Sequence, residues 1–357
     1  MASGELSYKE DEVPTFPHVY YAPNYKWEAG KLVLKEGKVA GTDEYIEGEA
    51  VITPNGQGIN VSFANATRNY SRLRIATIPK TEIKVDADNF APTDNPNRLY
   101  MTYTLTSDEK GNAYLYGTFY NNSIVTVKYR GATLKTYKFS KETENAKSYA
   151  LDATVISANS AEEIKSAIKQ EVANGKTAII LNLASDAGDN EFKTIREAFK
   201  NVKDATIDLT LIGCKEIPAD GLKELNALKS IFLPDVTKIG MNALFRCVYL
   251  EEICAPNVST IDERAFAGFI MLEKVTLGEL TDVRGEANSG GGIFDDDNWT
   301  PYIDLYLPKN QEVMKGEFDE NSNQYIWKPT GESYFASPDY DNGIFLGYQF
   351  NSVKSWE

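Results

Sequence analysis

Residues that could do enzyme chemistry are scarce in this sequence of 357 residues. The single histidine, His18, has no cysteine or serine motif nearby, so neither a histidine-based triad nor a metal-histidine site is expected. The sequence contains no GxSxG, HExxH or P-loop signature, and no GxGxxG in a βαβ context. With 52 acidic residues, a carboxylate pair of the glycosidase type can be drawn almost anywhere and carries little information. We therefore expect no enzyme activity, no cofactor and no metal site.

Two acidic clusters contain oxygen ligands of the kind that calcium accepts. Residues 295–297 are three aspartates, and residues 339–341 are Asp-Tyr-Asp followed by Asn-Gly. Neither cluster has the spacing of an EF-hand loop. We expect both to be solvated loops.

The elements that would position a site are organised by a repeat that begins at Leu228. The first copy, residues 228–239, reads LKSIFLPDVTKI, and the second, residues 250–261, reads LEEICAPNVSTI. A third copy starts at Leu272, so that Leu228, Leu250 and Leu272 recur at a fixed period. A fixed period in this range is typical of solenoids, whose units stack and bury one continuous core. The alternating apolar residues at the start of each copy predict a short strand.

Further copies lie on both sides. Leu209 and Leu211 match the strand positions one period upstream of Ile231 and Leu233. A looser copy, Leu181 and Leu183, lies 28 positions before Leu209 and Leu211. Downstream, Leu305 and Leu307 repeat the strand after an eight-residue insertion. Because one repeat cannot bury its apolar face alone, flanking copies or caps are required.

The repeat resembles the BspA-like class of bacterial leucine-rich repeats, whose recurring text is roughly L..I.LP..V..IG..AF..C..L. The sequence departs from this text at Leu244, Asp262 and Phe269, all compatible with a core. The resemblance covers about residues 206–283 and implies a short α/β leucine-rich-repeat solenoid. It also implies an exported or lipid-anchored surface protein.

The net charge of −15 disfavours binding to nucleic acid and to anionic membrane surfaces, since both require basic patches, and no such patch is visible in the sequence. No apolar run approaches the roughly 18 residues of a membrane span. The start, Met1-Ala-Ser-Gly, is not a signal peptide, which fits a mature or recombinant chain whose signal was removed. Together with the resemblance, we expect an extracellular or cell-surface location, with a lipid anchor as one option.

The three cysteines contain no CxxC and no even-numbered framework, so neither a zinc site nor a disulfide scaffold is predicted. Cys214 and Cys247 fall on inward repeat positions, where cysteine behaves as a small apolar residue. Cys254 falls on an outward strand position. We expect inert thiols, with a reactive or cross-linking Cys254 as the alternative.

The chain is predicted to be multidomain. We expect residues 1–18 to be a flexible segment, and residues 19–148 to form an all-β sandwich, immunoglobulin-like or similar, with a small barrel as the alternative. Within it, four runs between Leu99 and Phe139 are separated by short turns and predict an antiparallel meander.

Residues 149–357 are predicted to form the leucine-rich-repeat domain. A capping box at Ser160 to Glu163 begins a helix over about residues 160–174, which Asn174-Gly175 ends. We expect this helix to cap one end of the repeats and residues 308–357 to cap the other end.

Placing the repeats in register puts alternate side chains on one outward strand face. We predict a ligand-binding face formed by Asp208, Thr210, Ser230, Phe232, Glu252, Cys254, Lys274, Thr276, Asp304 and Tyr306. The aromatic side chains of Phe232 and Tyr306 do not pack into the core from this face, and exposed aromatics are enriched in binding sites. Alternatively, Phe232 packs under the N-terminal domain or under the C-terminal capping tail. The insertion with Trp299 and Tyr302 would enlarge the patch beside Tyr306.

These features lead to the hypothesis of a non-enzymatic surface protein that serves adhesion or captures a host or matrix protein through the strand face. A first alternative is a glycan-binding accessory protein of a carbohydrate-uptake system, with Trp299 or Trp327 stacking on sugars. A second alternative is a hydrolase with paired acids in a deep acidic cleft of the N-terminal domain.

Overall fold

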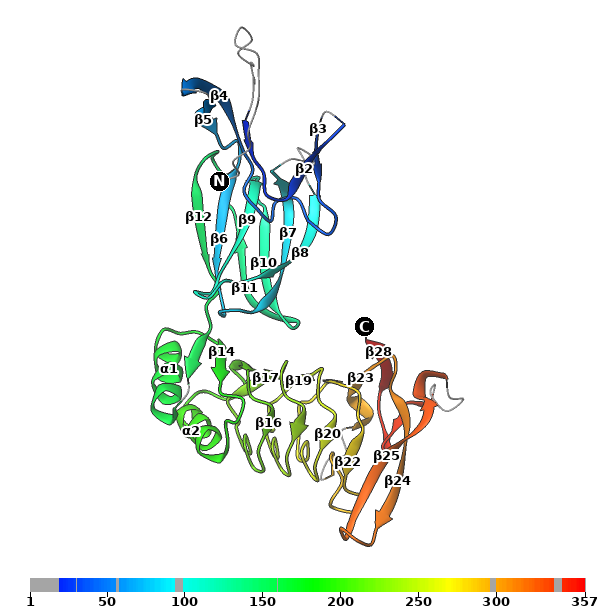
Figure 1. The fold of residues 1–357 in the computed structure, drawn as a ribbon. Helices are drawn as coiled ribbons and strands as arrows, with labels where there is room; N and C mark the ends of the chain where they lie inside the picture. Colours follow the sequence, from blue (N-terminus) through cyan, green and yellow to red (C-terminus); the bar gives the residue numbers. More distant parts are fainter. Residues whose placement is uncertain are drawn as a thin grey trace. The chain divides into compact units, whose positions relative to one another are not determined.

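The computed structural model describes residues 19–29, 31–55, 58–93, 99–158, 160–295, 300–336 and 342–356. The predictions for residues 1–18 with His18, for residues 296–299 with Trp299, and for residues 339–341 lie outside these residues. The chain divides into two compact units, Met1–Thr154 (unit 1) and Val155–Glu357 (unit 2). Both units are mostly β-strand (Figure 1).

The strands of unit 1 form three sheets. Its strands are β1 (Val19–Tyr21), β2 (Tyr25–Glu28), β3 (Lys31–Leu34), β4 (Ile46–Asn55), β5 (Gly58–Thr67), β6 (Ser71–Ala76), β7 (Glu82–Pro92), β8 (Leu99–Thr106), β9 (Asn112–Phe119), β10 (Ile124–Tyr129), β11 (Ala132–Lys138) and β12 (Ser148–Asp152). The largest sheet has the order β11-β10-β7-β9-β6-β12, with β8 also on β7. Strands β1, β4 and β5 form a second sheet, and β2 and β3 form a hairpin.

The prediction of a meander over residues 99–139 is wrong. Strand β8 pairs with β7, and β9 pairs with β6 and with the end of β7. Of the four predicted runs, only the last two, β10 and β11, therefore pair with each other as sequence neighbours. All of these strands bury alternate apolar side chains, such as Val85, Leu105 and Leu115. Turn residues determine where a strand ends. They do not determine which strand becomes its neighbour, because strands with equivalent apolar faces can pair in several orders. The immunoglobulin-like and barrel assignments stay predictions.

Strand β12 lies beyond the predicted domain boundary near residue 148 and yet belongs to the sheet of unit 1. It runs parallel to β6, with Tyr149 opposite Leu73 and Leu151 opposite Ile75. Leu151 is buried. Unit 1 therefore ends at Thr154.

Unit 2 contains two sheets of stacked strands. The first has the order β13 (Ile156–Ala158), β14 (Ala178–Leu183), β15 (Ile207–Ile212), β17 (Leu228–Phe232), β19 (Glu252–Ala255), β21 (Lys274–Leu277), β23 (Asp304–Pro308) and β28 (Ser352–Trp356). The second has the order β16 (Glu216–Ile217), β18 (Lys238–Ile239), β20 (Thr260–Ile261), β22 (Asp282–Arg284), β25 (Gln324–Ser333) and β24 (Glu312–Asp319). A short pair, β26 (Ile344–Phe345) and β27 (Tyr348–Gln349), and the 3-10 turns η1 (Thr300–Tyr302) and η2 (Tyr334–Ala336) complete the unit.

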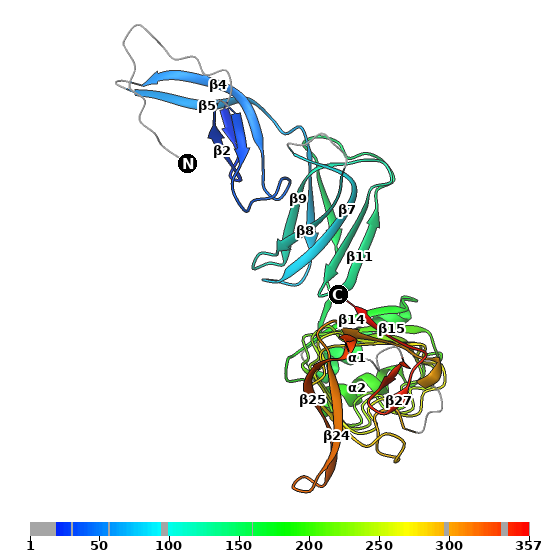
Figure 2. The ribbon, with the colours of Figure 1, turned by 90° about the vertical axis from the view of Figure 1, so that its right-hand side faces the viewer.

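Neighbouring repeats pair in parallel at the offset that the sequence period predicts. Ile231 lies opposite Ile253 in the first sheet, and Ile239 lies opposite Ile261 in the second. Figure 2 views unit 2 along this stack, so that successive repeats overlap. The side chains between the two sheets form one continuous buried cluster. Burial of this shared core is the main stabilising term for the repeats.

The register at the first looser copy differs from the prediction. The sequence pattern pairs Leu181 with Leu209, whereas the structure places Ile179 opposite Leu209 and Leu181 opposite Leu211. The longer offset accommodates helix α2 (Asp189–Phe199), whose Phe192, Ile195 and Phe199 are buried. Since a helix and its loops occupy this segment, the spacing of the other repeats does not apply there.

The helix predicted over residues 160–174 is confirmed as α1 (Ala161–Ala173). Its N-cap Ser160 accepts a hydrogen bond from the amide of Glu163, and Asn174 is the C-cap. Ile164, Ala167 and Ile168 are buried in the core of unit 2. The apolar stripe at helical spacing therefore packs as expected.

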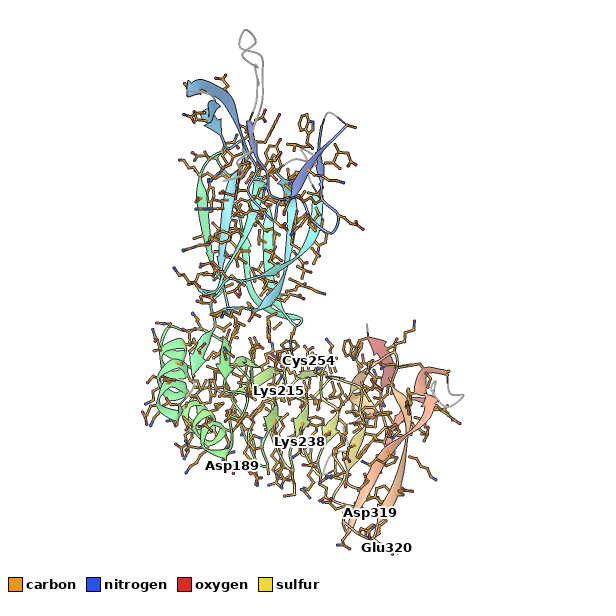
Figure 3. All side chains as sticks on the ribbon, in the orientation of Figure 1. Asp189, Lys215, Lys238, Cys254, Asp319 and Glu320 are labelled. Atoms are coloured by element: carbon orange, nitrogen blue, oxygen red, sulfur yellow. The ribbon has the colours of Figure 1, made fainter. Side chains whose placement is uncertain are left out.

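The C-terminal tail packs into the same core. Tyr334, Phe345 and Phe350 are buried there, and β28 adds the last parallel strand beside β23. Strands β24 and β25 form a hairpin that ends near Asp319 and Glu320 (Figure 3). The tail thus contributes both core side chains and an outer strand to the repeats.

Candidate functional site

The ten predicted face residues lie together in two rows across the first sheet of unit 2. Pairing of β14 through β28 aligns the first row as Ala178, Asp208, Ser230, Glu252, Lys274, Asp304 and Ser352. The second row is Ile180, Thr210, Phe232, Cys254, Thr276, Tyr306 and Lys354. We call these two rows the strand face.

The strand face points away from the core. Along each strand, the residues of the two rows alternate with buried residues such as Leu209, Ile231 and Ile253. Because side chains of a strand alternate between the two sides of the sheet, the two rows lie on the outer side. Thr276 is the only one of the ten predicted residues that is buried. Figure 3 shows Cys254 on this side, whereas Lys238 of the second sheet lies on another side.

At β19 to β28, charged groups of the strand face pair with one another. Lys274 Nζ lies 2.7 Å from Glu252 Oε1, and this hydrogen bond raises the pKa of Lys274. Lys354 Nζ lies 3.1 Å from Asp304 Oδ2, and that hydrogen bond raises the pKa of Lys354. We call this part, with Tyr306, the paired half.

Asp304 is the main acceptor of the paired half. Its Oδ1 accepts hydrogen bonds from Ser352 Oγ at 2.6 Å and from Asn351 Nδ2 at 2.7 Å, and Lys354 approaches Oδ2. Hydrogen bonds from Ser352, Asn351 and Lys354 lower the pKa of Asp304. The carboxylate therefore links β23 to β28.

Tyr306 lies between two cations. Lys274 Nζ and Lys354 Nζ are each 5.5 Å from the centre of its ring. Both distances are within the range of a cation-π interaction. The aromatic ring is half-buried and belongs to the network of the paired half.

At β15, β17 and Cys254 of β19 the strand face is different, and we call this part the open half. Asp208 Oδ1 accepts a hydrogen bond of 2.6 Å from Ser230 Oγ. Phe232 is half-buried, and its neighbours in the row are Thr210 and Cys254. No cation lies over the Phe232 ring among the described residues. An apolar ring between two small, uncharged side chains is available for contact with a partner.

The cysteines are free thiols with depressed acidity. Burial raises the pKa of Cys214 and of Cys247 to about 12, and that of Cys254 to about 11. Since the thiolate is the reactive form, all three thiols are unreactive at neutral pH. The expectation of inert thiols is therefore supported at Cys254, although its side chain reaches the strand face.

The expectation of a solvated loop at residues 295–297 is wrong for Asp295, which is only 4% exposed. Its carboxylate accepts hydrogen bonds from the amides of Asn288, Gly290 and Gly292 and from Tyr348 Oη. Burial alone would raise the pKa of Asp295, but these hydrogen bonds outweigh it and lower the pKa. Asp295 therefore organises the insertion from inside rather than offering oxygens to a metal.

Sequence reasoning missed two members of the strand face, Ser352 and Lys354. They lie on β28, which has no LxxIxL text and only one inward apolar residue, Val353. The only available signal is the alternation of polar and apolar residues around Val353. Ala178 and Ile180 of β14 were also missed, because the offset at the first copy is longer than the sequence pattern predicts.

Two described features bear on the alternative functions. A pocket of about 830 Å³ in unit 1 is lined by four cations, Lys80, Lys84, Lys128 and Arg130, and by one acid, Glu82, so it is not an acidic cleft. Trp327 packs against the core of unit 2 and donates a hydrogen bond of 3.0 Å to Gly285 O. It does not form an exposed platform for a sugar ring.

Comparison with known families identifies the repeats. A family model described as the BspA type leucine rich repeat region matches residues 188–290 in six copies. Residues 188–290 are therefore a BspA-type leucine-rich repeat region, which confirms the resemblance. The match lies within unit 2 and includes four strands of the strand face, β15 to β21. Neither the curated proteins nor the solved structures contain a match to the chain.

Among the residues that the structure describes, no helix has the length and apolar character needed to cross a membrane. Within the same residues, no three side chains of His, Cys, Asp or Glu are grouped to hold a metal ion.

Proposed function

We propose that this chain is a non-enzymatic, exported cell-surface protein that captures a protein partner through the strand face. In this proposal the repeats form a short leucine-rich-repeat solenoid, and unit 1 is an immunoglobulin-like sandwich that carries it. The BspA-type region supports a role in protein interaction at a surface. Fold alone does not fix function, so the argument depends on the strand face itself.

The observation that carries the proposal is the environment of Phe232. Its ring lies on the outer side of the sheet, between Thr210 and Cys254, with no cation over it among the described residues. Residues at the centre of protein interfaces are enriched in aromatics and depleted in charge. The open half has this composition, whereas the paired half satisfies its own charges.

The experiment is a binding screen with the full chain against matrix proteins and glycans. Phe232→Asp should weaken binding of the captured protein at least tenfold, because burying an aromatic anchor contributes roughly 2 kcal/mol or more. The matched control is Tyr249→Asp. Tyr249 is an exposed aromatic residue in the segment just before β19, and it is not part of the strand face. Equal affinity for all three proteins would contradict the proposal, and binding only to glycans would favour the accessory-protein alternative.

Location requires a separate test. The native precursor should carry an export signal, and protease added to intact cells should degrade the protein. A precursor without an export signal, together with full protection from the protease, would contradict a surface location.

A further inference from the structure

A second interaction surface lies at the outer edge of strand β24, in the second sheet of unit 2. This sheet begins with β16 and ends with β24, which pairs with β25 on one side. None of the other described strands pairs with the opposite edge of β24. Figure 1 shows β24 on the outside of the hairpin that it forms with β25. The outward amide and carbonyl groups of β24 are therefore not used by the described strands.

Strand β24 lacks most of the features that keep an edge strand from pairing. Protected edges are very short, contain proline or are covered by another element. The strand has eight residues, Glu312–Asp319, and none of them is proline. Its one irregularity lies between Glu312 and Met314, so the stretch from Met314 to the turn is regular. Lys315 is a charged edge residue, and such a charge opposes pairing unless the neighbouring strand compensates it.

Two exposed charges of β24, those of Lys315 and Glu317, have no ion pair among the described residues. Lys315 lies opposite Lys328 of β25, whose Nζ is already paired with Asp282 Oδ2 at 3.2 Å. Glu317 lies opposite the apolar Ile326. Like charges directly opposite each other in a sheet are destabilising, so Lys315 would gain from an acid on its other side.

The sequence of β24 is complementary to itself when two copies run antiparallel. With Gly316 of one copy opposite Gly316 of the other, Lys315 faces Glu317 of the second copy. Two-fold symmetry repeats this contact, so the interface contains two oppositely charged pairs. Met314 then faces Phe318 of the second copy. Phe318 is 57% exposed, and this contact would cover an aromatic side chain that a single copy leaves in water.

Neighbouring registers lack this complementarity. Residues directly opposite each other in an antiparallel pair share one side of the sheet, so a two-fold symmetric pair is centred on a residue. Centring the pair on Lys315 places two lysines opposite each other, and centring it on Glu317 places two glutamates opposite each other. Both contacts between like charges are unfavourable. The charges therefore select Gly316 as the centre.

We propose that two copies of this chain associate through β24, in an antiparallel pair centred on Gly316. Main-chain hydrogen bonds between the two edges supply attraction, and the two pairs of Lys315 with Glu317 select the register. The partner is a second copy because the charges of β24 complement those of β24 itself. The interface lies in a different sheet from the strand face and does not depend on the proposed capture of a protein.

The experiment measures the dissociation constant of the dimer by analytical ultracentrifugation of the full chain over a range of concentrations. The wild type should form a dimer as the concentration rises. Lys315→Glu and Glu317→Lys should each weaken the dimer at least tenfold, because each replaces two attractive pairs by two repulsive ones. The double variant Lys315→Glu/Glu317→Lys should return to within about threefold of the wild type, since the attractive pairs are restored with their signs exchanged.

The matched control is Lys309→Glu, which makes the same change of charge at an exposed lysine just before β24 and should leave the affinity unchanged. All the substituted side chains are exposed, so the unfolding temperature should not change. An equimolar mixture of the two single variants should associate, because each copy carries the charges that the other lacks. The proposal is overturned if the wild type stays monomeric at every concentration, if the control weakens the dimer as much as the single variants, or if the double variant is as weak as they are.

Discussion

Phe232 and Tyr306 lie in the same row of the same sheet, yet their surroundings are opposite. Tyr306 is held between Lys274 and Lys354, which are themselves paired with Glu252 and Asp304. Phe232 has Thr210 and Cys254 beside it. Identical backbone pairing therefore supports one half in which cations lie over the aromatic ring and one half in which, among the described residues, no cation does. An exposed aromatic on a repeat face indicates a binding site only where its neighbours leave the ring unoccupied.

The largest effect on the free energy of unfolding is expected for a core residue that lies beneath the open half, on the opposite side of β17. Ile231 is 1% exposed, and Ile231→Ala should lower the free energy of unfolding by about 2–5 kcal/mol through the cavity that it creates. Phe232→Ala, one residue along, should lower it by less than about 1 kcal/mol. Chemical denaturation measures both. If both variants lose equal stability, Phe232 is a core residue and the open half is not available for binding.

The next effect concerns Asp304 of the paired half. Asp304→Asn should lower the free energy of unfolding by about 1–2 kcal/mol, because the side chain accepts three hydrogen bonds, one of them from a cation. Asp208→Asn in the open half, where the carboxylate accepts a hydrogen bond from the neutral hydroxyl of Ser230, should cost less than about 0.5 kcal/mol. Urea denaturation compares the two variants.

The pH dependence follows from the lowered pKa of Asp304. A carboxyl group whose pKa is lowered by folding stabilises the protein above its ordinary value of 3.8, and this stability is lost as the pH falls through the folded value. The difference between wild type and Asp304→Asn should be constant above about pH 5 and shrink below pH 3.8. A difference that grows on acidification would contradict the hydrogen-bonded carboxylate.

A smaller effect is expected at Lys274. Lys274→Gln removes the ion pair with Glu252 and one cation over Tyr306, and should lower the free energy of unfolding by less than about 1 kcal/mol. High salt should reduce the difference, since the pair is partly exposed. Thermal unfolding at two salt concentrations measures it, and a loss that does not depend on salt would argue for packing instead of charge.

The last prediction concerns the rate of thiol labelling and involves no change in stability. Because the pKa of Cys254 is raised to about 11, its labelling should be slow at pH 8 and should rise about tenfold per pH unit. Cys214 and Cys247 should not react in the folded protein. A partner bound to the open half should slow labelling of Cys254 further. Rapid labelling at pH 8 would show that the thiol is not held as described.

The strand face could be predicted from the sequence because repeat spacing determines lateral position. Ser230, Glu252 and Lys274 follow one another at the repeat period and are adjacent in the sheet, and the eight-residue insertion still leaves Lys274 opposite Asp304. In parallel stacked strands, one register fixes the neighbours of every residue. The sequence therefore predicts the rows well, but it does not predict which charges in them pair.

Other features could not be predicted because they depend on contacts between distant segments. The partners of β8 and β9 in unit 1 depend on which apolar faces meet, not on turn residues. Strand β28 joins the sheet without any repeat text, and the buried Asp295 accepts a hydrogen bond from Tyr348, which lies far along the chain.

The most direct test of the central claim compares Phe232→Ser with Tyr306→Ser in binding to the same captured protein. Both variants remove a half-buried aromatic from the same row, so the change in chemistry is matched. The account predicts that Phe232→Ser weakens binding at least tenfold and that Tyr306→Ser weakens it no more than about threefold. The opposite order, measured on variants with intact folds, would contradict it and place the binding site in the paired half.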